Sequence, residues 1–288
     1  MSHLSQLKEH ESTSRRDFSD LIKNNEHLAN LIFYMHNIYE QIFNGKVGAP
    51  VHEKLQNGCK VLEVCCDDGI WITEVATEYP NTKFYAVDFT LPNFSNNIDN
   101  IIFIECDISK LLPFPDNEFD YISIKDKFMF INDDAFRKAL SEILRVLKPE
   151  GWLEVICSYG TDAVHGSEYT RLDSAWKSWL RVQNVDLNIR ANLENYLQET
   201  GKVESMSHRI VETPFINDHA FGEFMMEISL LFYRHIRNDL APFINLSFEE
   251  FDNLVKNAVS ELNDKDLKVT LKHKQVLARK KSTNSNEN

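Results

Sequence analysis

The chain has 288 residues, of which 43% are hydrophobic, and it carries a formal net charge of −13. This length suits one large α/β domain with additions, and the apolar fraction is ordinary for a globular protein. The acidic balance argues against nucleic acid as a partner, because nucleic-acid binding requires a basic surface. No apolar run is long enough to span a bilayer, so no membrane partner is expected.

The cysteines and the start of the sequence predict a compartment. Five cysteines, an odd number without metal-type spacing, lie at Cys59, Cys65, Cys66, Cys106 and Cys157. They predict a chain with reduced thiols and no metal site. The opening residues, MSHLSQLKEH, are polar and do not resemble a signal peptide. We therefore expect a cytoplasmic protein.

The predicted domain covers residues 18–280, between disordered tails at 1–17 and 281–288. Its first element is a helix over 25–43, with apolar residues at helical spacing up to Asn44-Gly45. Strand and helix signals then alternate. The predicted strands are 60–65, 83–88, 101–106, 120–125 and 152–158, and a helix over 133–147 stops before Pro149. This alternation predicts an α/β, doubly wound (Rossmann-like) fold with a seven-stranded, mostly parallel sheet.

The last two strands of that sheet come from the C-terminal part, which is otherwise helical. Helices are predicted at 169–183, 190–200 and 221–236, and the capping box Ser247-Phe248-Glu249-Glu250 opens another. The strands are 202–214 and 268–279, the latter alternating in a way that predicts a lysine-lined outer face. The helical insertion at about 218–264 suits either a lid over the site or a partner surface.

Three acidic residues stand at or just after the C-terminal ends of the first three strands: Glu63, Asp88 and Asp107. Ligands of open α/β sheets bind outside these strand ends. Carboxylates there can accept hydrogen bonds from ribose hydroxyls and an adenine amino group and can face an ammonium group. S-adenosylmethionine has all three parts. A nicotinamide dinucleotide would require a G-x-G-x-x-G loop, which this sequence lacks.

Three stretches carry a family resemblance. KVLEVCCDDGIWITEVATEYPNTKFYAVDFT, LPFPDNEFDYI and EILRVLKPEGWLEVI follow one another between residues 60 and 156. In order and spacing they resemble the class I S-adenosylmethionine-dependent methyltransferases. NGKVGAP and the pattern TRLDSAWKSWL…NLENYLQETG are similar to fungal methyltransferases of secondary metabolism.

The resemblance implies a set of cofactor-binding positions. Glu63 is expected near the amino group of the methionine moiety, and Asp88 at the ribose. Asp107 would accept from the adenine amino group. The remaining implied positions are the loop residues Cys65, Asp67 and Gly69, Phe89 and Ile108 beside the adenine, and Lys125 near the methionine end.

The loop departs from the family pattern acid-x-Gly-x-Gly-x-Gly. Cys65 and Asp67 occupy the first two glycine positions, and only Gly69 is kept. Glycine is favoured there because it adopts positive φ and lets the backbone approach a ligand. Asp67 adds a charge that either repels the ligand carboxylate or attracts the sulfonium. Glu150 likewise replaces a glycine of the common Lys-Pro-Gly-Gly turn, away from the ligand.

Methyl transfer from a sulfonium needs mainly an oriented acceptor, and a general base only where the acceptor loses a proton. The candidate bases are Tyr159 and His165, although the favoured interpretation of His165 is an ordinary histidine in a surface loop. The leading function is a methyltransferase that uses S-adenosylmethionine on a small-molecule acceptor. The alternative is a catalytically silent homologue that acts through a protein partner.

Overall fold

The structure is a computed structural model. It describes residues 26–89, 91, 98–108, 110–125, 133–159, 166–182, 185, 188–189, 191–214, 220–262, 264 and 270–282. The described residues form two compact units. The first comprises those within 1–157, 189–210 and 274–288, and the second those within 158–188 and 211–273. The tail predicted at 1–17 and most of that predicted at 281–288 lie outside the described residues.

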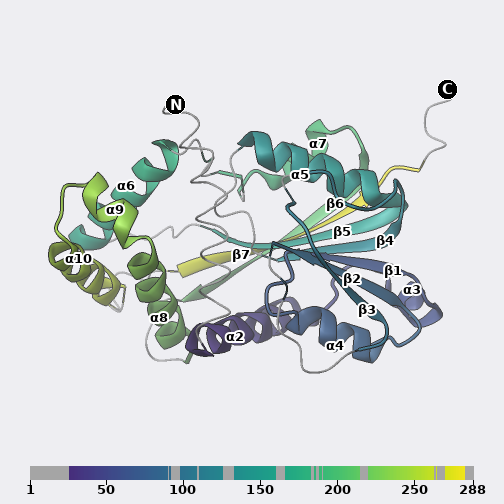
Figure 1. Ribbon diagram of the computed structural model, residues 1–288, viewed down its shortest axis with the longest axis horizontal. Helices are drawn as coiled ribbons and strands as arrows, with labels where there is room; N and C mark the ends of the chain where they lie inside the picture. Colours follow the sequence, from purple (N-terminus) through teal and green to yellow (C-terminus); the bar gives the residue numbers. More distant parts are fainter. Residues whose placement is uncertain are drawn as a thin grey trace. The chain divides into compact units, whose positions relative to one another are not determined.

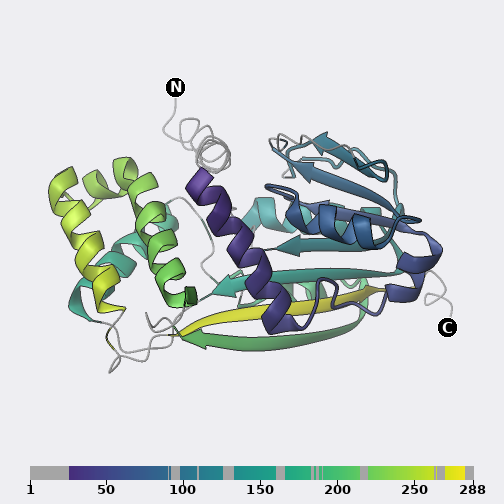
Figure 2. The ribbon, with the colours of Figure 1, turned by 90° about the horizontal axis from the view of Figure 1, so that it is seen from below.

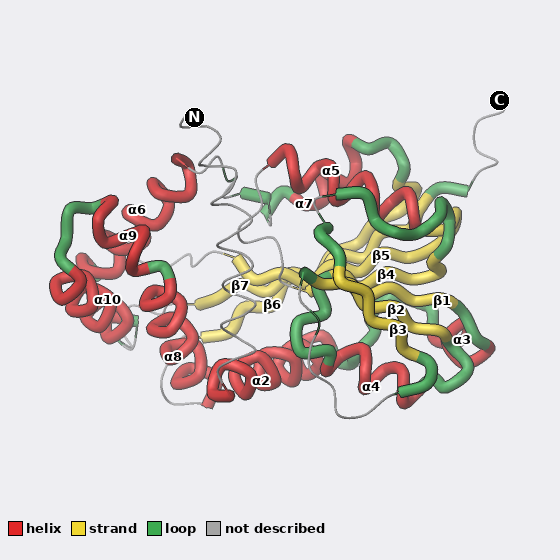
Figure 3. The backbone as a smooth tube through the Cα atoms, in the orientation of Figure 1, coloured by secondary structure: helices red, strands yellow, loops and turns green. Residues whose placement is uncertain are grey.

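A seven-stranded sheet with the order β3-β2-β1-β4-β5-β7-β6 organises the fold (Figures 1 and 3). Its strands are β1 (Lys60–Val64), β2 (Lys83–Asp88), β3 (Ile101–Glu105), β4 (Phe119–Lys125), β5 (Leu147–Tyr159), β6 (Val203–Pro214) and β7 (Thr270–Lys280). Strands β1 to β5 pair in parallel, whereas β7 is antiparallel. The predicted α/β Rossmann-like fold is confirmed.

Helices of the first unit cover both faces of the sheet. They are α2 (Glu26–Phe43), α3 (His52–Asn57), α4 (Ile70–Glu78), α5 (Asp133–Val146) and α7 (Leu193–Glu199). In Figure 1, α5 and α7 lie on one face and α2 and α4 on the other. Alternate strand residues therefore enter different cores. Val61 packs with Trp71 of α4, whereas Leu62 packs with Phe136 of α5.

Buried Glu154 fastens the loop after α2 to the sheet. Its Oε2 accepts hydrogen bonds from the backbone N–H of Gly48 at 2.8 Å and from the hydroxyl of Tyr121 at 2.7 Å. Its Oε1 accepts from Gln275 on β7. A Cβ on Gly48 would lie 2.2 Å from the Gln275 amide, so this glycine is required by close approach. Contacts with four groups offset the cost of burying the carboxylate.

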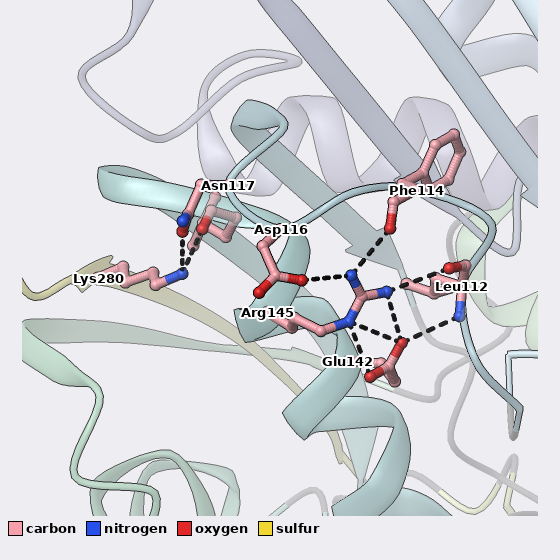
Figure 4. A network of polar contacts seen from close by, with 8 residues as sticks. Leu112, Phe114, Asp116, Asn117, Glu142, Arg145 and Lys280 are labelled. Carbon is pink, nitrogen blue, oxygen red and sulfur yellow. Dashed lines mark hydrogen bonds and ion pairs between the residues drawn. The ribbon is translucent and has the colours of Figure 1, made fainter.

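The segment LPFPDNEF before β4 is held by Arg145 of α5 (Figure 4). The guanidinium donates to the carboxylates of Glu142 and Asp116 and to the carbonyls of Leu112 and Phe114. Glu142 in turn accepts from the backbone N–H of Leu112 at 3.0 Å. This arrangement lowers the pKa of the Glu142 carboxyl, chiefly through its hydrogen bonds to Arg145. The planar guanidinium of Arg145 thus fixes the segment that leads into β4.

The second unit is helical and has its own apolar core. It contains α6 (Ser167–Val182), α8 (Ala220–His235), α9 (Arg237–Phe243) and α10 (Phe248–Glu261). The predicted capping box at Ser247 is confirmed, because Ser247 and Glu250 exchange hydrogen bonds at the start of α10. The Glu261 carboxylate accepts from the backbone N–H groups of Glu168 and Tyr169 and so caps α6. Helix α8 ends at His235, close to the predicted end at 236, and the short helix α9 that follows it was not predicted.

The prediction of a lysine-lined outer face on the last strand is wrong. Lys274 is 4% exposed, and its ammonium donates to the Ala191 carbonyl and the Glu194 carboxylate. His273 is fully buried. The reason is that the Lys274 side chain meets Ala191 and Glu194 of the α7 region instead of solvent; β7 is also an inner strand, between β5 and β6. Among the described helices, none combines the length and apolarity needed to cross a bilayer.

Candidate cofactor site

The candidate site begins at the C-terminal end of β1. Glu63 is 5% exposed and lies between Ala86 of β2 and Ser123 of β4 in the parallel register. The apolar strand β1 is buried on both faces of the sheet. The Glu63 carboxylate near its C-terminal end is therefore buried as well. The predicted first acidic residue therefore stands where parallel strands present their carboxyl ends.

The loop after β1 has left-handed backbone at three alternate positions, only one of which is glycine. Cys65, Asp67 and Gly69 have φ values of 60°, 48° and 70°. These are the three positions where the family pattern has glycine, and all three are left-handed. Left-handed backbone costs an L-residue roughly 1–2 kcal/mol, and aspartate tolerates it better than cysteine. The surrounding hydrogen bonds, such as Cys65 N–H to the Val87 carbonyl at 2.8 Å, hold the loop in this form.

Asp88, the last residue of β2, is tied to this loop. Its Oδ2 accepts from the backbone N–H of Asp67 at 2.8 Å, and its Oδ1 accepts from that of Phe89 at 2.7 Å. The side chain is buried, at 5% exposed for the residue. A carboxylate oxygen has two lone pairs, so accepting one hydrogen bond does not by itself prevent it from accepting a second. The predicted ribose acid thus also shapes the loop.

Asp68 carries the least satisfied charge in the loop. Its Oδ1 accepts from the backbone N–H of Ile70 at 3.2 Å, but its buried Oδ2 has no hydrogen-bond partner among the described residues. Burial raises the pKa of Asp68 from 3.8 to about 6. No role was predicted for Asp68, because the residues next to it in the sequence do not indicate that its carboxyl is buried.

The third predicted acid follows β3. Asp107 has a carboxylate oxygen 3.5 Å from the ammonium of Lys110, and the neighbouring Ile108 is 1% exposed. The backbone N–H of Cys106 donates to the Asp88 carbonyl, which joins the ends of β2 and β3. The second and third acids are therefore held on adjacent strands, as the sequence predicted.

Lys125 ends β4 and lies over an aromatic ring. Its ammonium nitrogen is 4.3 Å from the ring centroid of Trp71, a residue of α4 that the sequence analysis did not single out. Burial lowers the pKa of Lys125 to about 8, while the negative charge of Glu63 partly opposes that shift. Lys125 and the loop thus belong to the same edge of the sheet, since β1 and β4 are parallel neighbours.

The structure does not test the two candidate general bases. Tyr159 is the last residue of β5 and belongs to the second unit, and His165 lies outside the described residues. Of the predicted cofactor positions, the structure places Glu63, the loop residues, Asp88 and Lys125 at one end of adjacent strands. What the sequence missed are contacts between residues far apart in the chain, such as Asp67 with Asp88 and Lys125 with Trp71.

Comparison with known proteins agrees with this geometry. Residues 61–151 match the family described as "Methyltransferase domain". The demethylmenaquinone methyltransferase of Staphylococcus aureus strain JH9 is 29% identical over 150 residues, which cover 49% of this chain and 58% of that protein. The same enzyme from strain Newman matches equally. The match thus spans less than two thirds of the length of these curated relatives.

Solved structures show the same fold. Phosphoethanolamine N-methyltransferase 2 of Haemonchus contortus, solved with phosphomonomethylethanolamine and S-adenosylhomocysteine, superposes with a TM-score of 0.50 at 19% identity. That superposition covers 92% of this chain and 60% of the other. MccD protein gives a TM-score of 0.50 at 14% identity, over 86% and 96% of the two chains. Residues 61–151 therefore match a methyltransferase-domain family, and the chain adopts the α/β fold of these solved methyltransferase structures.

Proposed function

We propose that this chain binds S-adenosylmethionine at the loop after β1 and transfers its methyl group to a small-molecule acceptor. One observation carries the proposal: Cys65, Asp67 and Gly69 all have left-handed backbone, although only one of them is glycine. Such strain persists where the surrounding structure over-determines it, and it concentrates at ligand sites. The loop thus retains the shape that a glycine loop would present to a ligand.

The donor and acceptor groups fit the cofactor. Asp88 would accept from ribose hydroxyls, since both carboxylate oxygens are held in place by backbone N–H groups. Glu63 would lie by the α-amino group, and Asp107 would accept from the adenine amino group. Phe89 and Ile108 would flank the adenine. The left-handed loop leaves the backbone free to approach the ligand, except where the side chains of Cys65 and Asp67 stand.

The cofactor would supply a methyl group already activated by its sulfonium charge. The chain's own residues then bind and orient the reactants, and orientation provides most of the acceleration in such a transfer. For an acceptor that loses a proton, Tyr159 and His165 remain the predicted general bases. Lys125, whose pKa of about 8 lets its amine accept a proton in mildly alkaline solution, is a third.

The narrower features of the proposal rest on the sequence alone. The net charge of −13 disfavours nucleic acid as the acceptor. The likeness to fungal methyltransferases of secondary metabolism favours a small organic molecule. The helical residues of 218–264 offer either a lid or a protein-binding surface, and the silent-homologue alternative would use the latter.

The two functions differ in what the loop side chains do. Cys65 is buried and Asp67 adds a charge where the family pattern has glycine. In an enzyme these side chains must leave room for the cofactor. In a silent homologue they need not, and replacement by glycine would restore binding. The substitutions therefore provide a direct test.

The experiment is isothermal titration calorimetry of the parent and of the Cys65→Gly/Asp67→Gly variant with S-adenosylmethionine and S-adenosylhomocysteine. Micromolar binding by the parent, about −8 kcal/mol, supports the enzyme and directs the search to acceptors. Binding by the variant alone identifies a silent homologue with a blocked loop. No heat from either folded protein at millimolar ligand overturns cofactor binding altogether.

A further inference from the structure

Three metal-ligating side chains converge between α2 and α4, on the face of the sheet opposite α5. His36 and Glu40 are four residues apart on α2, so they share one side of the helix. Glu74 comes from α4, which lies beside α2 in both views (Figures 1 and 2). One ligating atom from each residue lies within 4.8 Å of the others. All belong to the first unit.

We propose that His36, Glu40 and Glu74 bind one divalent transition-metal ion, Zn²⁺ in the first instance, and that the ion fastens α2 to α4. Nothing in the methyltransferase proposal requires this site. One imidazole and two carboxylates form a donor set of the kind that Zn²⁺ accepts. Three protein ligands also leave a fourth position for water or another small ligand.

The distances are close to those that a bound ion needs. Zn–N and Zn–O bonds of about 2.0–2.2 Å in a tetrahedron place the ligand atoms about 3.4 Å apart. His36 Nε2 and Glu74 Oε2 are 3.0 Å apart, and the widest separation in the cluster is within 4.8 Å. The ligands therefore need to shift by little more than an ångström. The Glu40 and Glu74 side chains are 35% and 33% exposed, so an ion can enter from solvent.

Electrostatics show that a cation is already favoured at this place. The Lys46 ammonium lies 3.4 Å from a Glu74 oxygen and 3.7 Å from a Glu40 oxygen. His36 is buried, and its Nε2 lies 3.0 Å from the Glu74 carboxylate. Lys46 competes with the ion for the same carboxylates. Removing its charge should therefore strengthen metal binding, whereas removing a ligand should weaken it.

The cluster escaped the sequence analysis because the decisive partner is distant in sequence. Glu74 is 38 residues from His36, and only the packing of α2 against α4 joins them. The His-x-x-x-Glu spacing within residues 36–40 is frequent on helices and carries little information alone. The sequence expectation of no metal site was based on the spacing of the cysteines.

The test is equilibrium dialysis and calorimetry of the full chain, freed of metal by chelator, with Zn²⁺. We expect one ion per chain, and His36→Asn and Glu74→Gln should each weaken binding by about 10- to 100-fold or more. Lys46→Met should tighten it by about tenfold, the effect of removing one competing charge at a partly exposed site. Glu53→Gln, which removes an exposed carboxylate on α3, is the control and should leave zinc affinity almost unchanged.

Cobalt provides a second readout that does not depend on affinity. With Co²⁺, imidazole and carboxylate ligands give weak visible bands, whereas a cysteine site gives an intense thiolate charge-transfer band. Absence of stoichiometric binding in both the parent and Lys46→Met overturns the proposal. So does a thiolate band, or binding that His36→Asn and Glu74→Gln leave intact, provided circular dichroism shows that these variants are folded.

Discussion

Two segments of the first unit have left-handed residues where the family pattern has glycine, and they differ in what surrounds them. In the turn 148–151, Glu150 has φ 61°, its side chain is exposed, and its carboxylate lies 3.6 Å from the Arg279 guanidinium. In the loop 63–69, Cys65 has φ 60° but its side chain is buried. The backbone is nearly the same in both, whereas the space around the side chain is not.

The difference separates two reasons for a glycine. Gly151, beside Glu150, is kept because a Cβ would lie 2.8 Å from both the Lys148 carbonyl oxygen and a Leu147 methyl group. Left-handed backbone alone did not require glycine at 150, because the side chain can point to solvent. Close approach requires it at 151. In the loop 63–69 the group that approaches the backbone would be the ligand. The side chains of Cys65 and Asp67 should therefore affect ligand binding more than folding.

The largest effect is expected from Asp88→Ala, which releases the loop from β2. The backbone N–H groups of Asp67 and Phe89 lose their charged acceptor. We expect unfolding free energy to fall by about 2–4 kcal/mol and S-adenosylmethionine binding to disappear. Urea unfolding and calorimetry measure both. Asp116→Ala, which removes a mostly exposed carboxylate from Arg145, is the control, and equal losses in the two variants would contradict a special role for Asp88.

Next, Gly151→Ala measures the cost of steric contact at a glycine whose backbone is not left-handed. The added methyl group meets backbone and Leu147 in a buried turn, so we expect a loss of about 1–3 kcal/mol. Gly201→Ala is the counterpart: Gly201 has φ 66° and open space around it, which predicts a loss of about 1 kcal/mol from conformation alone. Thermal unfolding of both variants measures the two costs. A larger loss at 201 than at 151 would reverse our interpretation.

Asp68→Asn tests the buried charge of the loop through its pH dependence. The folded-state pKa of Asp68 is raised from 3.8 to about 6, so the folded parent binds the proton more tightly than the unfolded chain. The parent therefore loses stability as pH rises from about 4 to 6, and the penalty is complete above that range. The variant should be more stable by about 1–3 kcal/mol at pH 7.5 and by almost nothing at pH 4. A pH-independent difference would contradict burial of the charge.

The smallest effect is expected at Glu150→Gly. Relief of left-handed strain, about 1 kcal/mol, is partly cancelled by the greater freedom of the unfolded chain. The lost contact with Arg279 is exposed and contributes little. We expect stability to rise by about 0.5 kcal/mol and cofactor affinity to stay unchanged. A clear loss of stability in urea unfolding would show that the Glu150 side chain does more than occupy solvent.

Much of the fold was predictable because its signals are local. The predicted strand 83–88 coincides with β2, and the apolar stripe of Phe136, Leu140 and Ile143 forms the buried face of α5. The surroundings of the last strand were not predictable. Alternation along 268–279 suggested a half-exposed strand, but Lys274 contacts Ala191 and Glu194, which lie 83 and 80 positions earlier in the chain. Local patterns give an element's type, not what packs against it.

The site divides in the same way. Glu63, Asp88 and Asp107 were predicted from their places at strand ends, which the sequence shows directly. The hydrogen bond from Asp67 to Asp88 joins residues 21 positions apart, and its existence depends on the loop adopting left-handed backbone with non-glycine residues. The sequence left open how those residues affect cofactor binding, since the charge of Asp67 either repels the ligand carboxylate or attracts the sulfonium. In the structure the surrounding contacts hold the loop in the left-handed form.

The position of β7 has a consequence for how the sheet is assembled. Strand β6 joins the sheet only through β7, although β6 precedes it in the chain. Lys280 contacts the carbonyl of Leu147, a residue 133 positions earlier in the chain. The sheet is therefore complete only when β7, at the end of the chain, pairs with β5. Closing this long loop costs chain entropy before the strand contacts form. Until then β5 presents an unpaired edge, the kind of surface at which chains associate wrongly.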